Sequence, residues 1–193
     1  MSSTNRNSTR NKNDYYVTPI YAINNFLDKL EEFHNGMFHR KNVLDPCAGG
    51  DINNPMSYPT ALKNKYNNSI NHIETLDIRE DSLANTKADF LSYTPEKKFD
   101  VVITNPPFVL AQEIIEKSFD VTSDDGYVIM LLRLNFFGGQ KRKAFWDKHL
   151  PIYSFVHSKR MSFTETGGTD SIEYMHCVWS KKHKPNYTKL VII

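Results

Sequence analysis

Short apolar runs alternate along this chain with apolar residues at helical spacing. The clearest helical spacing joins Ile20, Ile23, Phe26, Leu27 and Leu30, which lie three or four positions apart, as on one face of a helix. The same spacing predicts further helices over residues 57–66, 109–119 and 141–150. Short apolar runs predict strands over residues 41–44, 73–78, 88–91, 99–104, 126–134, 153–157 and 173–179.

The order of these predicted elements indicates an α/β fold class. Strands and helices alternate through most of the chain, which is typical of a mostly parallel sheet with helices on both faces. The last two predicted strands follow one another without a helix between them, so we expect an antiparallel pair at one edge. In such sheets, ligands bind beyond the carboxyl ends of the strands. The residues that follow each strand are therefore the first candidates for a functional site.

Length and composition fit one folded domain with a short tail. A chain of 193 residues with 39% hydrophobic residues can bury a single core. Ser, Thr and Asn dominate residues 1–13, which we predict to be a disordered N-terminal tail ahead of one domain at residues 14–193.

The net charge of +2 comes from that tail. Subtracting its three basic residues, Arg6, Arg10 and Lys12, from the total of 24 leaves 21 basic residues against 22 acidic ones. The overall charge therefore does not indicate nucleic-acid binding, which would need a local basic patch.

Several classes of protein are excluded by what the sequence lacks. The longest apolar run, residues 127–132, is too short to cross a membrane, and the polar N-terminus does not look like a secretion signal. Cys47 and Cys177 lie far apart, which favours a reducing, cytoplasmic location over a disulfide framework. The histidines show no ligand spacing, so we expect no metal. Neither a Ser-His-Asp arrangement nor a GxxxxGK phosphate loop is present.

The segment Asn105-Pro106-Pro107-Phe108 directly follows the predicted strand at residues 99–104. Its prolines fix the backbone and remove two amide donors, so the strand must end there in a rigid turn. Such a turn can hold the Asn105 side-chain oxygen beside a backbone carbonyl, and these two acceptors would grip the N–H bonds of an aromatic amine. The amine lone pair would then be aimed at a sulfonium methyl group, while Phe108 stacks on a base swung out of its helix. The structural alternative is a proline turn that only caps the strand, with Phe108 in the core.

This tetrapeptide resembles the motif of the amino-methyltransferases that act on nucleobases, above all the DNA adenine-N6 methyltransferases. The resemblance implies a Rossmann-like methyltransferase fold, S-adenosylmethionine as cofactor, and methyl transfer to the exocyclic amino group of adenine in DNA. Residues 105–108 would form the catalytic site.

The resemblance covers most of residues 14–180, which is only the catalytic core of the family. Larger members carry a target-recognition domain that has no counterpart here, so sequence choice would fall to loops or to a protein partner, or specificity would be low. The small core suggests a phage or mobile-element enzyme in the cytoplasm of a bacterial or phage-infected host cell.

The segments ahead of the tetrapeptide resemble the cofactor half of the same family. Members carry Asp-Pro-x-x-Gly-x-Gly after the first strand, and this chain follows that pattern through Gly50 but has Asp51 in place of the last glycine. Carboxylates near the ends of the next two strands would bind the ribose and the adenine amino group. A Tyr-x-Thr-Pro segment would cover the methionine part. Its threonine, Thr18, is also a candidate N-cap of the first helix, and Pro19 suits the first helical turn. The predicted cofactor contacts are Tyr16, Thr18, Pro19, Asp45, Pro46, Cys47, Ala48, Gly49, Asp77, Ile78, Asp89, Phe90 and Asn105.

Basic and aromatic residues beyond the fourth main strand are candidates for contacts with nucleic acid. Glycines and aromatic residues accompany the basic positions at 133 and 141–143, which suits phosphate contact near a base pocket. A plain surface helix would explain residues 141–143 about as well. Two later segments, 159–163 and 168–174, also resemble parts of these enzymes that lie near the target base. The predicted substrate contacts are Arg133, Lys141, Arg142, Arg160, Phe163 and Asp170.

Two alternative functions are compatible with the same motifs. The tetrapeptide also occurs in enzymes that methylate RNA bases or the glutamine amide of proteins, although the glutamine enzymes usually have Tyr at the position of Phe108. RNA stays open as a substrate. A third hypothesis is a non-catalytic binding subunit that keeps the fold, and the irregular loop after Gly50 motivates it.

Overall fold

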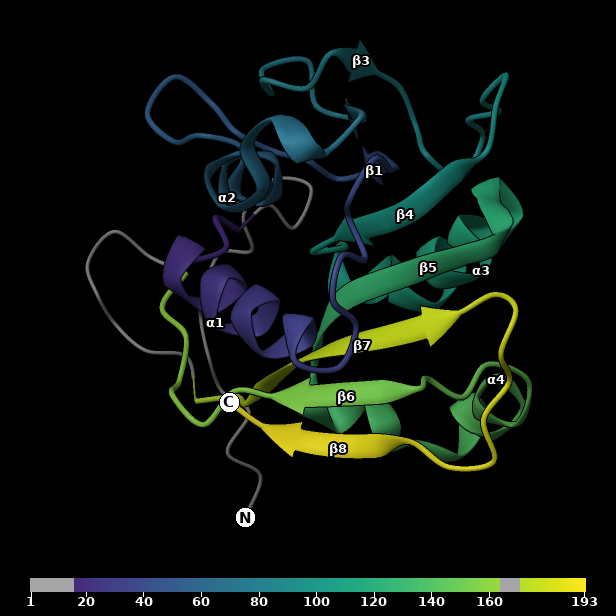
Figure 1. Cartoon of the computed structure of the whole chain (residues 1–193). Coiled ribbons are helices and arrows are strands. Elements are labelled where there is room, and N and C mark those ends of the chain that lie inside the picture. Colours follow the sequence, from purple (N-terminus) through teal and green to yellow (C-terminus); the bar gives the residue numbers. More distant parts are fainter. Residues whose placement is uncertain (1–15, 164–170) are drawn as a thin grey trace.

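A computed structural model describes residues 16–163 and 171–193 (Figure 1). The predicted tail at residues 1–13 lies outside the described residues. Within these residues, eight strands form one sheet in the order β3-β2-β1-β4-β5-β7-β6-β8. The strands are β1 (Asn42–Asp45), β2 (His72–Asp77), β3 (Thr86–Lys87), β4 (Phe99–Thr104), β5 (Thr122–Arg133), β6 (Tyr153–Val156), β7 (Tyr174–Ser180) and β8 (Lys189–Ile192).

The sheet is mostly parallel, as the sequence predicts. Neighbouring strands from β3 to β5 all pair in parallel. β7 runs antiparallel to both β5 and β6, so β6 and β7 form the predicted antiparallel pair. β8 then adds to β6 in parallel and becomes the edge strand. β8 was not among the predicted strands.

Helices cover both faces of the sheet. α1 (Ile20–Glu31) and α2 (Ser57–Tyr66) lie on one face, and α3 (Ala111–Val121) and α4 (Lys143–Lys148) lie on the other (Figure 1). Successive strand residues point to opposite faces: Val101 and Ile103 of β4 join the core under α1, whereas Val102 joins the core under α3. No helix in the described part of the chain combines the length and apolar character needed to cross a membrane.

The boundaries of α2 and β4 agree with the predictions, and the largest difference is at β5. This strand begins at Thr122, directly after α3 ends at Val121. Its first residues include Ser123, Asp124 and Asp125, and these polar side chains hide the start of the strand from a search for apolar runs. The predicted strand at residues 88–91 is a turn that follows the two-residue β3.

A chain of hydrogen-bonded polar side chains crosses the core under α1 and α2. Tyr58 Oη lies 2.8 Å from His176 Nε2, and His176 Nδ1 lies 2.8 Å from His157 Nε2. All three side chains are buried, and His176 also stacks on Phe26 at a centroid distance of 4.1 Å. Burial lowers the pKa of His157 to about 4 and that of His176 well below its ordinary value. Both imidazoles are therefore neutral at pH 7.

Candidate active site

One cavity is lined by residues at the carboxyl ends of β1, β2 and β4 and in the turn after β3. Parallel strands bring these ends to the same edge of the sheet, where ligands bind in folds of this class. The lining residues are Tyr16, Val17, Thr18, Pro46, Cys47, Ala48, Gly50, Ser57, Tyr58, Asp77, Ile78, Arg79, Asp89, Phe90, Leu91, Asn105, Pro107, Leu110 and Ile114. Of the predicted cofactor contacts, Pro19, Asp45 and Gly49 are not part of this lining. The structure therefore brings together most of a set of residues chosen from five separate segments of sequence.

Asp77 fastens the glycine turn after β1 to the end of β2. Its Oδ2 accepts a hydrogen bond from the Gly49 amide, and its Oδ1 accepts one from the Arg79 amide, each at 2.8 Å. Gly49 and Gly50 have positive φ angles of 64° and 74°, a region that favours glycine. A Cβ on Gly50 would lie 2.9 Å from Met56 Cγ. The turn thus needs both glycines to reach the cavity wall in this conformation.

Asp51 stands where the family pattern has its last glycine, and it closes a compact turn. Its Oδ1 accepts hydrogen bonds from the amides of Asn53 and Asn54 at 2.8 and 2.9 Å. The Asp51 amide in turn donates to the Asn54 carbonyl oxygen at 2.8 Å. Carboxylates that accept from amides two or three residues on stabilise turns of this kind. The departure from the family pattern is therefore a well-bonded turn, and Gly50 stays on the cavity wall.

Arg79 and Tyr58 also line the cavity, and neither was among the predicted cofactor contacts. The Arg79 guanidinium donates to the Gly50 carbonyl oxygen at 2.8 Å, and its Nε lies 3.5 Å from Asp77 Oδ1. The side chains of Arg79 and Asp77 are each only 9% exposed, so this ion pair is shielded from solvent. The one available signal for Arg79 was its position two residues after Asp77. Tyr58 reaches the cavity from α2, and no motif marks it.

The orientation of Asn105 is set by a contact with the segment before α1. Asn105 Nδ2 donates to Thr18 Oγ1 at 3.0 Å. Its Oδ1 is buried and has no hydrogen-bond partner among the described residues. A buried acceptor left without a donor costs about 1–3 kcal/mol, so this oxygen is ready for a donor from a ligand. Pro106 is buried directly behind Asn105 in sequence, and Pro107 lines the cavity.

The prediction of Thr18 as the N-cap of the first helix is wrong. Pro19 occupies that position, and no side chain caps the helix. The Thr18 hydroxyl instead accepts the hydrogen bond from Asn105 described above, so Thr18 makes a tertiary contact rather than a helix cap.

Asp45 lies behind the cavity wall at the end of β1. Its Oδ1 accepts from the Cys47 amide at 3.3 Å, while its Oδ2 is buried without a hydrogen-bond partner in residues 16–163 and 171–193. Burial raises the pKa of Asp45 to about 7. Burial also raises the pKa of the Cys47 thiol, so Cys47 is an uncharged wall residue at neutral pH.

The turn after β3 supplies a wall with one carboxylate and two apolar side chains. Asp89 is exposed, and its Oδ1 accepts from the Leu91 amide at 3.0 Å. Phe90 is buried beside it, whereas Ile78 across the cavity is 58% exposed. Apolar surfaces with a single well-placed acceptor suit a planar heterocycle that carries an exocyclic amino group.

Aromatic side chains gather beside the Asn105–Phe108 turn. The ring of Phe108 lies 5.7 Å from that of Tyr174, which lies 4.9 Å from the ring of Phe163. Phe163 is 6.1 Å from Tyr16, which lines the cavity. The Arg133 guanidinium carbon lies 4.5 Å over the Phe108 ring, and Arg133 Nε is buried with no hydrogen-bond partner among the described residues. Phe108 is only partly buried, so it is not a core residue.

Arg142 and Lys141 lie away from this aromatic group. Arg142 donates to the Gly138 carbonyl oxygen at 2.8 Å, and its guanidinium carbon lies 4.6 Å over the Phe136 ring. Arg142 is therefore engaged in holding the glycine loop before α4. Lys141 is exposed on that loop.

Of the other predicted substrate contacts, some lie beside the Asn105–Phe108 turn and one is held in an ion pair. Arg160 forms an ion pair with Glu173 at 3.1 Å, with both side chains about half exposed. Phe163 and Arg133 join the aromatic group beside the Asn105–Phe108 turn. Asp170 lies outside the described residues.

Known structures share this arrangement of strands and helices. A putative class I S-adenosylmethionine-dependent methyltransferase from Listeria monocytogenes superposes with a TM-score of 0.66 at 16% identity, over 92% of this chain and 65% of that chain. A putative RNA methyltransferase from Pyrococcus horikoshii gives a TM-score of 0.63 at 16% identity, over 88% of each chain. The N-methyltransferase NodS from Bradyrhizobium japonicum, in complex with S-adenosyl-L-homocysteine, gives 0.57 at 8% identity, over 86% of this chain and 89% of that chain. This chain thus spans just under two thirds of the Listeria protein.

The strand order and these likenesses define the chain as a Rossmann-like fold of the S-adenosylmethionine-dependent methyltransferase type. Residues 52–127, which are less than half of the chain, match the model of the Eco57I restriction-modification methylase family. The matched segment contains Asp77, Asp89 and the whole Asn105–Phe108 turn. No curated protein matches the chain.

Proposed function

We propose that this protein transfers the methyl group of S-adenosylmethionine to the N6 amino group of adenine in DNA. The observation that supports it most directly is the buried Oδ1 of Asn105, which has no hydrogen-bond partner in residues 16–163 and 171–193 and lies in a cavity at the carboxyl ends of the strands. The match of residues 52–127 to a restriction-modification methylase family favours DNA as the acceptor.

The residues around the cavity fit the proposed cofactor. Asp77 uses one lone pair on each oxygen for backbone amides, so each oxygen can still accept from a ribose hydroxyl. Asp89 uses only Oδ1 in its turn, which leaves Oδ2 for the amino group of an adenine packed on Phe90. The backbone of the glycine turn would lie against the methionine part. When bound, S-adenosylmethionine supplies an electrophilic methyl group on a positively charged sulfur.

Asn105 would prepare the target amine for attack. Its Oδ1 and the adjacent backbone carbonyl would accept the two N–H bonds of the adenine amino group, which favours a tetrahedral nitrogen with a localised lone pair. Thr18 keeps the amide in the orientation that presents oxygen rather than nitrogen. The chain thus contributes positioning and electrostatics, and no covalent intermediate is required.

Phe108 and Arg133 would hold the target nucleotide outside the helix. An enzyme that modifies a base in DNA must take the base out of the stack, and an aromatic ring then replaces the lost stacking. The Arg133 guanidinium brings a positive charge to the same ring. This charge would attract the phosphate of the extruded nucleotide.

RNA is the second candidate acceptor, since a putative RNA methyltransferase is among the similar folds. The test is incubation with labelled S-adenosylmethionine and unmethylated DNA or RNA, followed by digestion to nucleosides. We expect label in N6-methyldeoxyadenosine. Label in RNA nucleosides alone would assign the acceptor to RNA. A protein that binds no S-adenosylmethionine in calorimetry would be a non-catalytic subunit.

A further inference from the structure

A second groove lies at the opposite ends of the strands from the active-site cavity. It is formed where β6 and β8 begin, where the antiparallel β7 ends, and beside the residues after α1. Its volume is about 460 Å³, which lies within the range of small-molecule sites. Its lining residues are His34, Tyr127, Ile152, Tyr153, Ser180, His183, Lys184, Pro185, Asn186, Tyr187 and Lys189. None of them belongs to the site described above.

The floor of this groove is a set of packed rings. His34 lies edge-on between Tyr127 and Tyr153, with centroid distances of 5.4 and 5.6 Å. Burial lowers the pKa of His34, so the ring is neutral and stacks as an aromatic group at neutral pH. Tyr187 stands at the rim and is 78% exposed, which leaves most of its ring open to a partner.

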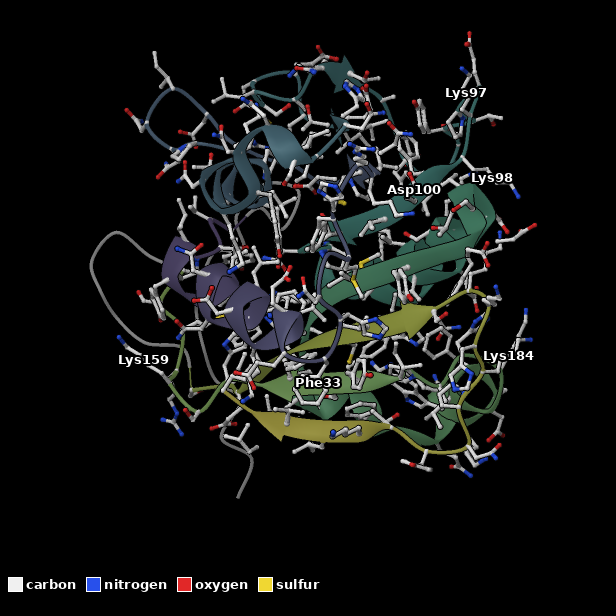
Figure 2. All side chains as sticks on the ribbon, in the orientation of Figure 1. Phe33, Lys97, Lys98, Asp100, Lys159 and Lys184 are labelled. Atoms are coloured by element: carbon white, nitrogen blue, oxygen red, sulfur yellow. The ribbon has the colours of Figure 1, made fainter. Side chains whose placement is uncertain are left out.

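The rim of the groove is positively charged. Residues 181–189 contain four lysines and no acidic residue. Lys181 and Lys182 pair with aspartates of β5 at 3.6 and 2.7 Å, and Lys189 Nζ lies 4.4 Å over the Phe33 ring. Lys184 is exposed and forms no ion pair within the described ranges (Figure 2).

Hydrogen bonds hold the loop that carries these residues. Lys181 Nζ donates to the Thr122 carbonyl oxygen at 2.7 Å at one end of the loop. Thr188 Oγ1 donates to the Pro151 carbonyl oxygen at 2.8 Å at the other end. The cations and the open ring are therefore presented on an anchored loop, which lowers the entropic cost of binding.

We propose that this groove binds a single-stranded segment of nucleic acid, with bases on Tyr187 and Tyr153 and phosphates on Lys184 and Lys189. Aromatic rings on which bases stack and cations that contact phosphates are the two elements by which proteins hold single strands without reading their sequence; here Tyr187 is open, and Tyr153 is partly buried in the floor. Tyr127 and Arg133 are six residues apart on β5, so the groove is roughly 20 Å from the catalytic turn. The nucleotides bound in this groove are therefore different from the target nucleotide at the catalytic turn.

Binding at this groove would tether a long substrate. A strand held at a second site raises the effective concentration of the target at the first one. This effect rests on the proposed methylation of nucleic acid, whereas binding at the groove does not. The two ideas can therefore fail separately.

The test is binding of a fluorescent oligothymidylate of about 20 nucleotides, measured by anisotropy. This probe contains no adenine and so lacks the proposed acceptor base. We expect Tyr187→Ala to weaken binding roughly tenfold, because each lost base–aromatic stack costs about 5- to 150-fold. Lys184→Gln should lower the slope of log affinity against log salt by about 0.7, the value for one phosphate contact in a single strand.

Lys97→Gln is the matched control, since Lys97 is also exposed and lies away from Lys184 (Figure 2). It should bind the probe as the wild type does. No binding by the wild-type protein would overturn the proposal. So would equal affinity of the wild type, Tyr187→Ala and Lys184→Gln, or the same loss in Lys97→Gln.

Discussion

Replacing Thr18 with Val tests how Asn105 is oriented. Valine keeps the shape of threonine but removes the hydroxyl that accepts from Asn105 Nδ2 at 3.0 Å. A hydrogen bond of this type contributes about 0.5–1.5 kcal/mol. Without it, the Asn105 amide would populate the flipped orientation that presents a donor to the substrate. We expect the rate of methyl transfer to fall about 2- to 12-fold, since about 1.4 kcal/mol corresponds to a factor of ten.

The assay is single-turnover methyl transfer at saturating DNA and labelled S-adenosylmethionine, with cofactor affinity measured separately by calorimetry. Both substrates must be saturating because Thr18 also lines the cavity, so that a change in cofactor affinity is not read as a change in rate. Thr18→Ser keeps a hydroxyl at the same position and should restore most of the rate. A Thr18→Val enzyme with the wild-type rate, or a Thr18→Ser enzyme as slow as Thr18→Val, would refute the reasoning.

Three further predictions concern Asp77, the glycine turn after β1 and the buried histidine His157. Asp77→Asn should weaken S-adenosylmethionine binding by tenfold or more in calorimetry, because it loses the ion pair with Arg79 and sets an amide N–H against a backbone amide. Gly50→Ala should lower the free energy of unfolding by about 1–3 kcal/mol more than Gly36→Ala in chemical denaturation. Both positions have positive φ, but a Cβ would lie 2.9 Å from its nearest neighbour at Gly50 and 3.8 Å at Gly36. The pKa of His157, lowered to about 4 by burial, means that the unfolded chain takes up a proton between about pH 6.5 and 4 that the folded chain does not. Stability is then lost as the pH falls through this window. In His157→Gln, the free energy of unfolding measured by chemical denaturation should fall less across the same window, by up to about 3 kcal/mol. Parallel pH curves for the two proteins would contradict this.

Local rules of sequence predicted the parts of the site that depend on strand ends. Asp77 is the last residue of β2 and the Asn105–Phe108 turn directly follows β4, and parallel pairing is sufficient to bring such strand ends together. Asp89 was placed within a predicted strand at residues 88–91, whereas it lies in the turn after the two-residue β3.

Contacts between distant segments could not be predicted in this way. Thr18 and Asn105 are 87 residues apart, and sequence patterns assign a threonine before a helix to a cap because that is its commonest local role. Tyr58, on α2, both lines the cavity and belongs to the core that α2 shares with α1, and this placement depends on how the helix packs. Arg142 lies in a basic segment of the kind that contacts phosphates. Its hydrogen bond to the Gly138 carbonyl oxygen depends on the conformation of the loop, which the sequence pattern does not reveal.

The most direct test of the proposed chemistry compares Asn105→Ala with the wild-type enzyme in single-turnover formation of N6-methyladenine in DNA. The control is Asn25→Ala, an exposed position on α1. Loss of one preorganised hydrogen-bonding group at a reacting centre costs about 100- to 1,000-fold in rate. We predict a loss of this size for Asn105→Ala with cofactor affinity retained, and the wild-type rate for Asn25→Ala. Formation of N6-methyladenine by Asn105→Ala at the wild-type rate would contradict the account.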